Sequence, residues 1–321
     1  MNIGRALSPA GAALVSFLLA ATPPAPAAAE PSLWRRSDDP NLVRVERALR
    51  RVSRFVDWVA EADTDPDMRH DFWLGALVTA EQSGARAFED PRLKLLVAQI
   101  LLGAELGRED EAAALGRAVL AQAPEPWLEA EARLVLVLAA REPEAAISEV
   151  ARALPLIWDS RTRSELFRRR ADARMAQGDV RGSLLDYRAA LRADDSASSS
   201  ALARFGIGLA LERSGNLPEA FSELRLARLS APRVFGVELG VLTLPGVFAF
   251  RSQDVNYAAA LTEQSLAVSS NEPEVALSAC ERASQAWREY VSEAKPDDPW
   301  LERARRHATD LAARCEQRPP R

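Results

Sequence analysis

Small residues recur at fixed distances along the middle of this chain, and this recurrence constrains the fold more than any other feature. Counting from Ala201, Gly208 is the eighth residue, Gly215 opens a Gly-Asn turn, Ala220 is the twentieth and Ala227 the twenty-seventh. Two packed helices approach closely only where the facing side chains are small. The spacing therefore predicts a hairpin of two closely packed helices.

Three earlier stretches follow the same template. They begin at residues 93, 127 and 164, so the four starts are separated by 34, 37 and 37 residues. Self-similarity at a period of about 20–50 residues indicates stacked supersecondary units. Gly107 and Gly178 stand at the expected turns, whereas Arg141 takes the turn position of the second stretch. The twentieth place holds a small residue in all four stretches: Ala112, Ala146, Ser183 and Ala220.

This pattern resembles the tetratricopeptide repeat (TPR), which has small residues at its eighth, twentieth and twenty-seventh places and a Pro after its second helix. The resemblance implies an all-α fold, an α-solenoid of antiparallel helix pairs. The residues outside the repeats add a C-terminal capping helix and one non-helical insertion. The resemblance also implies a concave groove, lined by the first helix of each pair, that binds a segment of a protein partner. Carried over residue by residue, the groove is expected at Arg168, Asp172, Met175, Phe205, Leu209 and Arg213.

The chain divides into six segments by composition and periodicity. Residues 30–92 are expected to form a divergent N-terminal helix pair, with helices over 41–61 and from Pro66 to about Ala87. The four repeats occupy 93–234, and 257–316 hold a helix pair followed by a capping helix. Asp298-Pro299 opens that last helix, because Pro is well tolerated in a first turn. The tail 317–321 is expected to be disordered.

Between the fourth repeat and the C-terminal pair, residues 235–256 break the helical period. The segment is apolar and interrupted by Gly and Pro, so we interpret it as an ordered, non-helical insertion. Two roles remain open for it. It packs over the apolar end of the fourth pair, or Phe235, Phe248 and Phe250 line a site for a partner segment.

Residues 1–29 have the features of a signal peptide. Arg5 precedes an apolar run over 10–21, and a Pro-rich stretch leads to the small residues Ala27 to Ala29. This predicts export to the periplasm or beyond. Later apolar stretches are interrupted by charge, so we expect no transmembrane segment in the mature chain.

Two cysteines, Cys280 and Cys315, lie in the C-terminal helices. In a helical hairpin that turns near Pro296, facing residues have numbers that sum to about 593, and these two sum to 595. An even pair in an oxidising compartment favours a disulfide. The alternative is two unpaired, buried small residues.

No motif of an enzyme occurs in the sequence. There is no metal-binding His-Glu-x-x-His, no Gly-x-Ser-x-Gly and no phosphate-binding Gly-rich loop with Lys, so we expect no catalytic residues, no metal and no cofactor. His70 and His307 stand alone on charged helices, where a surface or capping role is expected. The net charge of -5 argues against nucleic acid as a partner.

We therefore interpret the chain as a scaffold or adaptor of the bacterial cell envelope that recognises a protein segment in a helical-repeat groove. Two alternatives stay open: a structural subunit with edge-to-edge contacts, and an envelope hydrolase with an unrecognised site. The sequence identifies neither the partner nor the oligomeric state.

Overall fold

The computed structural model describes residues 66–84, 89–103, 107–231, 242 and 247–316, together with six residues between 43 and 51. Contacts divide the chain into two compact units, residues 1–162 and 163–321. Each unit is described separately. In the described ranges all regular secondary structure is helical.

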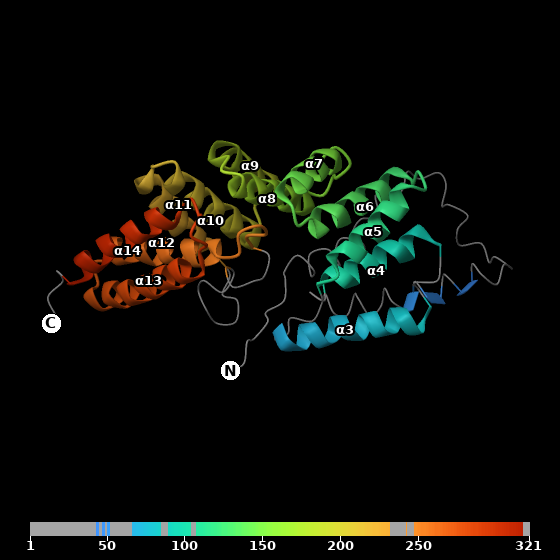
Figure 1. The fold of residues 1–321 in the computed structure, drawn as a ribbon, viewed down its shortest axis with the longest axis horizontal. Helices are drawn as coiled ribbons and strands as arrows, with labels where there is room; N and C mark the ends of the chain where they lie inside the picture. The colour runs from blue at the N-terminus through green and yellow to red at the C-terminus, as the bar shows by residue number, and fades with distance from the viewer. Residues whose placement is uncertain are drawn as a thin grey trace. The chain divides into compact units, whose positions relative to one another are not determined.

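Unit 1 consists of helices that pack against their neighbours in sequence (Figure 1). Helix α3 packs on α4, α4 on α5, α5 on α6 and α6 on α7, and α4 also contacts α6. The alternation of neighbouring pairs with a next-but-one contact is the arrangement of stacked helical hairpins. The helices are α3 (Pro66–Gln82), α4 (Pro91–Gly103), α5 (Glu109–Leu120), α6 (Pro126–Ala139) and α7 (Pro143–Ala153).

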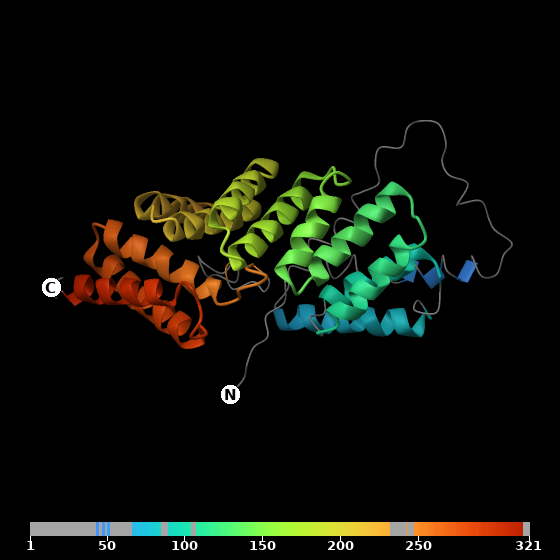
Figure 2. The ribbon, with the colours of Figure 1, turned by 45° about the horizontal axis from the view of Figure 1, so that its top comes forward.

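Unit 2 repeats this arrangement with longer helices (Figures 1 and 2). Helix α9 packs on α10, α10 on α11, α11 on α12, α12 on α13 and α13 on α14, and α10 also contacts α12. Helix α8 joins α9 through hydrogen bonds between their side chains. The helices are α8 (Ser160–Ala176), which begins at the end of unit 1, α9 (Val180–Ala193), α10 (Ala197–Arg213), α11 (Leu217–Ser230), α12 (Asp254–Ser269), α13 (Pro273–Glu293) and α14 (Leu301–Glu316).

The small residues lie where the helices meet, as predicted. Ala112, Ala146, Ser183 and Ala220 are all completely buried. Gly208 faces Leu224 so closely that an added Cβ would lie 2.6 Å from the leucine side chain. The predicted all-α fold of consecutive helix pairs is therefore confirmed.

The turns between paired helices follow the sequence equally closely. Gly178 and Gly215 have φ angles of 82° and 91°, which glycine adopts without a steric cost. The next residue caps the following helix in both places: Asp179 accepts a hydrogen bond from the Gly182 N–H, and Asn216 accepts one from the Glu219 N–H. In each of these two repeats the local sequence therefore specifies both the turn and the start of the second helix.

Arg141 replaces the turn glycine in the second repeat and makes a different contact. Its guanidinium donates to Glu109 at 2.7 Å and to the Gly107 carbonyl at 3.4 Å. The Arg141 side chain thus links the turn of the second helix pair to the turn of the preceding pair. Partial burial acts to raise the pKa of Glu109, but the hydrogen bond and charge of Arg141, together with a backbone hydrogen bond, hold it below its usual value.

A disulfide joins the last two helices. Cys280 on α13 and Cys315 on α14 are bonded with their Cα atoms 6.2 Å apart, so the predicted pairing is confirmed. Cys280 belongs to the hydrophobic core of unit 2, which also includes Tyr257, Trp287 and Tyr290, and Cys315 packs against this core. Helix α14 covers this core with Ala304 and Leu311, as expected of a capping helix.

Several predicted segments fall wholly or partly outside the described residues. These are the signal peptide over 1–29, most of the helix over 41–61 and the tail 317–321. Within the insertion 235–256, residues 247–253 are non-helical, and α12 then begins at Asp254, three residues earlier than expected. None of the helices in the described ranges is long and apolar enough to cross a membrane.

Candidate functional site

The residues predicted to line a groove lie on the first helices of the pairs in unit 2. Arg168, Asp172 and Met175 share one stripe of α8, since residues three and four apart lie on the same face of a helix. Phe205, Leu209 and Arg213 share the corresponding stripe of α10.

All six are buried. Met175 packs with Tyr187 and Ile207, while Phe205 and Leu209 belong to the hydrophobic core of unit 2. Arg168, Asp172 and Arg213 lie among other charged side chains from several elements. We call this group the polar cluster, and its members are Arg168, Asp172, Glu212, Arg213, Arg251, Asp254, Asp298, Arg303 and His307.

Asp172 occupies one end of the polar cluster. Its carboxylate accepts a hydrogen bond from the Tyr187 hydroxyl and one from the Ala249 backbone N–H, the latter at 3.4 Å. Burial raises the pKa of Asp172 to about 7, although the Tyr187 hydroxyl and the Arg168 charge pull it down. Arg168 itself pairs with Glu165 one turn away. A carboxyl group with this pKa changes its charge near neutral pH.

Arg213 lies at the centre. Its guanidinium makes two hydrogen bonds to the Asp254 carboxylate, at 2.6 and 2.9 Å. It also lies between the rings of Tyr257 and Trp300, whose centroids are 5.0 and 4.8 Å from the guanidinium carbon. Burial acts to lower the pKa of Arg213, but the charge and hydrogen bonds of Asp254, together with Tyr257 and Tyr290, keep the pKa above its usual value.

Arg251 extends the cluster from the non-helical segment. It donates to Asp298 at 2.7 Å, to the Tyr290 hydroxyl at 3.2 Å and to Asp254 at 3.3 Å. Burial raises the pKa of Asp298, but the Trp300 backbone N–H and the Arg251 charge leave it below its usual value. Asp298 thus stays ionised and binds the start of α14 to the segment before α12.

The Glu212 carboxylate on α10 interacts with side chains of both α12 and α14. The Tyr257 hydroxyl donates to it at 2.8 Å, His307 Nε2 lies 2.9 Å from it, and the Arg303 guanidinium also pairs with it. Burial acts to raise the pKa of Glu212, but the hydrogen bonds from His307 and Tyr257 lower it below its usual value.

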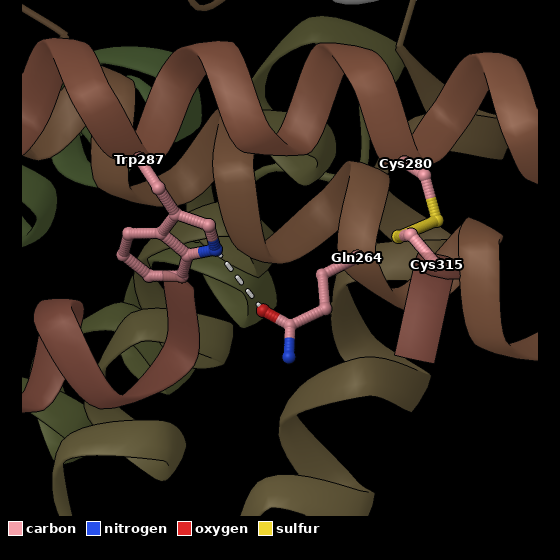
Figure 3. The surroundings of a disulfide bond; sticks show 4 residues. All are labelled: Gln264, Cys280, Trp287 and Cys315. Atoms are coloured by element: carbon pink, nitrogen blue, oxygen red, sulfur yellow. Dashed lines mark hydrogen bonds between the residues drawn. A yellow bond between two sulfur atoms is a disulfide. The ribbon is translucent and has the colours of Figure 1, made fainter. Parts of the chain in front are cut away.

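His307 therefore does not have the surface role expected of it. Its ring stacks on Trp287 with centroids 5.1 Å apart and planes within 2°. The Trp287 indole N–H donates to Gln264 Oε1 at 3.1 Å (Figure 3). In the same view the Cys280–Cys315 disulfide closes the adjoining part of α13 and α14.

Sequence reasoning missed most of this cluster. Arg251 and Asp254 lie at the end of a segment without a helical period, and Asp298, Arg303 and His307 come from the last helix and the turn before it. The Asp298-Pro299 helix start was a local signal for one of them. No local feature of the sequence indicates that the other residues of the cluster come together near Glu212 and Arg213 of α10.

Unit 1 has no comparable network among its described residues, but it contains one buried carboxyl group. Gln99 on α4 donates to Glu131 on α6 at 3.4 Å, and both side chains are buried. Burial raises the pKa of Glu131 to about 8. The other polar atom of the Gln99 side chain, its amide oxygen, has no hydrogen-bond partner.

The helices and their contacts define the class of protein: an all-helical protein built from consecutive packed helix pairs. No protein family description matches the chain, and no curated protein matches it. Among solved structures, the chain is similar to a crystal structure of the TPR domain of P58(IPK), with 17% identity over 85% of this chain and 99% of that one. The TM-score is 0.26, so this likeness supports no conclusion about function.

Proposed function

We propose that this chain is a non-enzymatic scaffold of the bacterial cell envelope that binds a partner protein through the face of unit 2 that bears the polar cluster. The observation behind this proposal is the concentration of charged side chains on the first helices of successive pairs. Charged residues are seldom buried, and buried ion pairs are often no more stable than apolar residues of similar volume. A network of this size is therefore poorly explained by stability alone, and recognition of a polar partner explains it better.

Two features support a location in the cell envelope. The N-terminal sequence has the charge, apolar run and small residues of an export signal. A disulfide joins α13 to α14, and disulfides persist mainly in oxidising compartments. Together they favour the periplasm or the cell exterior as the place of action.

A second candidate function is that of a structural subunit with edge-to-edge contacts. Trp158 follows α7 and has 91% of its surface exposed, and Trp127 at the start of α6 has 45% exposed. Because α6 and α7 form an antiparallel hairpin, the start of one and the end of the other lie at the same end. Exposed tryptophans are common anchors of protein interfaces.

Site-specific photo-crosslinking in intact cells would test both candidates. A photoreactive amino acid is placed at position 250 beside the polar cluster, at position 158, or at position 185. Leu185 is an exposed residue of α9 outside the polar cluster and serves as the matched control. Crosslinked products are identified by mass spectrometry.

A single stoichiometric partner crosslinked from position 250, and not from 185, is the expected result. The same product from position 158 alone would favour the structural subunit instead. If neither position yields a discrete partner while the chain is exported and folded, the scaffold proposal fails.

A further inference from the structure

The face of unit 2 that carries the predicted groove residues is covered by the chain itself. Residues 247–251, Val-Phe-Ala-Phe-Arg, form a non-helical segment immediately before α12, drawn in orange in Figure 1. Val247 and Phe248 are buried in the same hydrophobic cluster as Phe205 and Leu209. The segment thus occupies the place where the sequence resemblance predicts a partner peptide.

Its polar contacts reach the predicted groove residues or their immediate partners. The Ala249 N–H donates to Asp172 at 3.4 Å, and the Phe250 ring lies under the Arg169 guanidinium with its centroid 5.4 Å away. Arg251 then reaches Asp254, which holds Arg213, and Asp298. A backbone N–H on a carboxylate, an aromatic ring on a guanidinium and an arginine between two acids are contacts typical of peptide recognition.

The surface beneath the segment differs from an ordinary core. A core position under an apolar segment normally carries apolar side chains. Asp172, which the Ala249 N–H contacts, and Arg213, which shares Asp254 with Arg251, are instead ionisable and at most 6% exposed. Arg213 is imperfectly satisfied, because its Nε has no hydrogen-bond partner. Such a surface is better suited to a state in which the covering segment is exchanged for another ligand.

We propose that residues 247–251 are an intramolecular pseudoligand: they occupy the binding face of unit 2 and are displaced by a partner segment of the same chemistry. That partner segment is non-helical and carries an aromatic residue followed directly by arginine, as Phe250-Arg251 does. This inference rests on the proposed scaffold function and adds to it the chemistry of the partner and the competition for its site.

The test uses the full mature chain with Phe250→Ala and Arg251→Ala combined. Both side chains are only partly buried, so the change weakens the segment without removing Val247 or Phe248 from the core. A fluorescent peptide containing Val-Phe-Ala-Phe-Arg is titrated by anisotropy, with a scrambled peptide as the control. A site that is mostly self-occupied has its affinity for an external ligand reduced by the fraction that is open. The double variant is therefore expected to bind the peptide at least about tenfold more tightly than the wild-type chain.

The matched control variant is Leu185→Ala, which changes an exposed residue of α9 outside the polar cluster. It should bind the peptide as weakly as the wild-type chain. A folded double variant that binds the peptide no better than wild type, or binds the scrambled peptide equally well, overturns the proposal.

Hydrogen exchange of the wild-type chain gives a second, independent test that needs no variant. A displaceable segment opens without global unfolding, so the amides of 249–251 should exchange at least about 100-fold faster than those in the middle of α10 and α12. Equal protection would show that the segment is a fixed part of the core and would overturn the proposal. If the peptide tests fail while position 250 still crosslinks a discrete partner, only this inference falls and the scaffold function stands.

Discussion

Arg213 and Asp254 form a buried, two-bonded ion pair that joins α10 to the start of α12. The Arg213 side chain is fully buried and that of Asp254 is 2% exposed. A pair of this kind has lost nearly all of its hydration, so its two members depend on each other.

Removing one partner alone should therefore be costly. Asp254→Asn leaves the Arg213 charge without its main counter-ion, and we expect a loss of about 3–5 kcal/mol in the free energy of unfolding. Urea denaturation followed by circular dichroism measures this loss. Arg213→Met combined with Asp254→Leu should recover at least half of it. A cost below about 1 kcal/mol for Asp254→Asn would contradict the dependence of the two residues on each other.

Gly206 allows α10 to lie directly against the ring of Tyr187 on α9. A Cβ at position 206 would come within 2.2 Å of the tyrosine ring. Gly206→Ala should therefore destabilise unit 2 by about 1–3 kcal/mol, although alanine is the better helix former.

The double variant Gly206→Ala with Tyr187→Leu isolates this clash. Once the ring is gone, adding the methyl group should cost less than about 0.5 kcal/mol in thermal denaturation. An equal cost of Gly206→Ala with and without the ring would show that the close approach to Tyr187 is not its cause.

The helix pairs could be predicted because their signals are local. Gly208, Gly215 and Ala220 lie within thirteen residues of one another, and their sizes alone state where two helices cross and where the chain turns. The disulfide could be predicted because the residue numbers of Cys280 and Cys315 place the two cysteines opposite each other in one helical hairpin. In each of these cases the interacting residues belong to neighbouring elements.

The closure of the predicted groove could not be predicted in this way. Arg303 and His307 reach Glu212 from more than 90 residues away in the sequence, and Ala249 reaches Asp172 from 77 residues away. Nothing in the periodicity of α14 specifies which earlier helix it meets. The resemblance predicted the positions of the groove residues, but the burial of these residues depends on contacts with residues that are distant in the sequence.

The Cys280–Cys315 disulfide closes a loop of 35 residues. In the chain-entropy account such a cross-link stabilises the fold by about 3–4 kcal/mol. Cys280→Ser with Cys315→Ser should lower the midpoint of thermal unfolding, and a dithiol reductant should lower that of the wild-type chain to the same value.

Reductant should leave the double serine variant unchanged, which controls for other effects of the reagent. Hydrogen exchange should rise most in α14, because the disulfide anchors its C-terminal end. Equal unfolding midpoints with and without the bond would show that packing of α14 alone holds the C-terminal part.

Glu131 makes the stability of unit 1 depend on pH. The pKa of its carboxyl group rises from 4.5 to about 8 in the folded chain, because the group is buried. Between pH 4.5 and 8 the folded state keeps the proton that the unfolded state has lost. Raising the pH through this window therefore favours unfolding, and the stabilisation present below pH 4.5 is gone above pH 8.

Glu131→Gln removes this titration while keeping the shape of the side chain and its contact with Gln99. The difference in unfolding free energy between the variant and the wild-type chain should grow by about 1.4 kcal/mol for each pH unit within the window and favour the variant at pH 8.5. Urea denaturation at pH 5, 6.5 and 8.5 measures it. Asp172 titrates in both proteins, so its contribution cancels in the difference. A difference that stays constant across these pH values would mean that Glu131 is ionised in the folded chain, and the buried, protonated carboxyl group beside Gln99 would have to be abandoned.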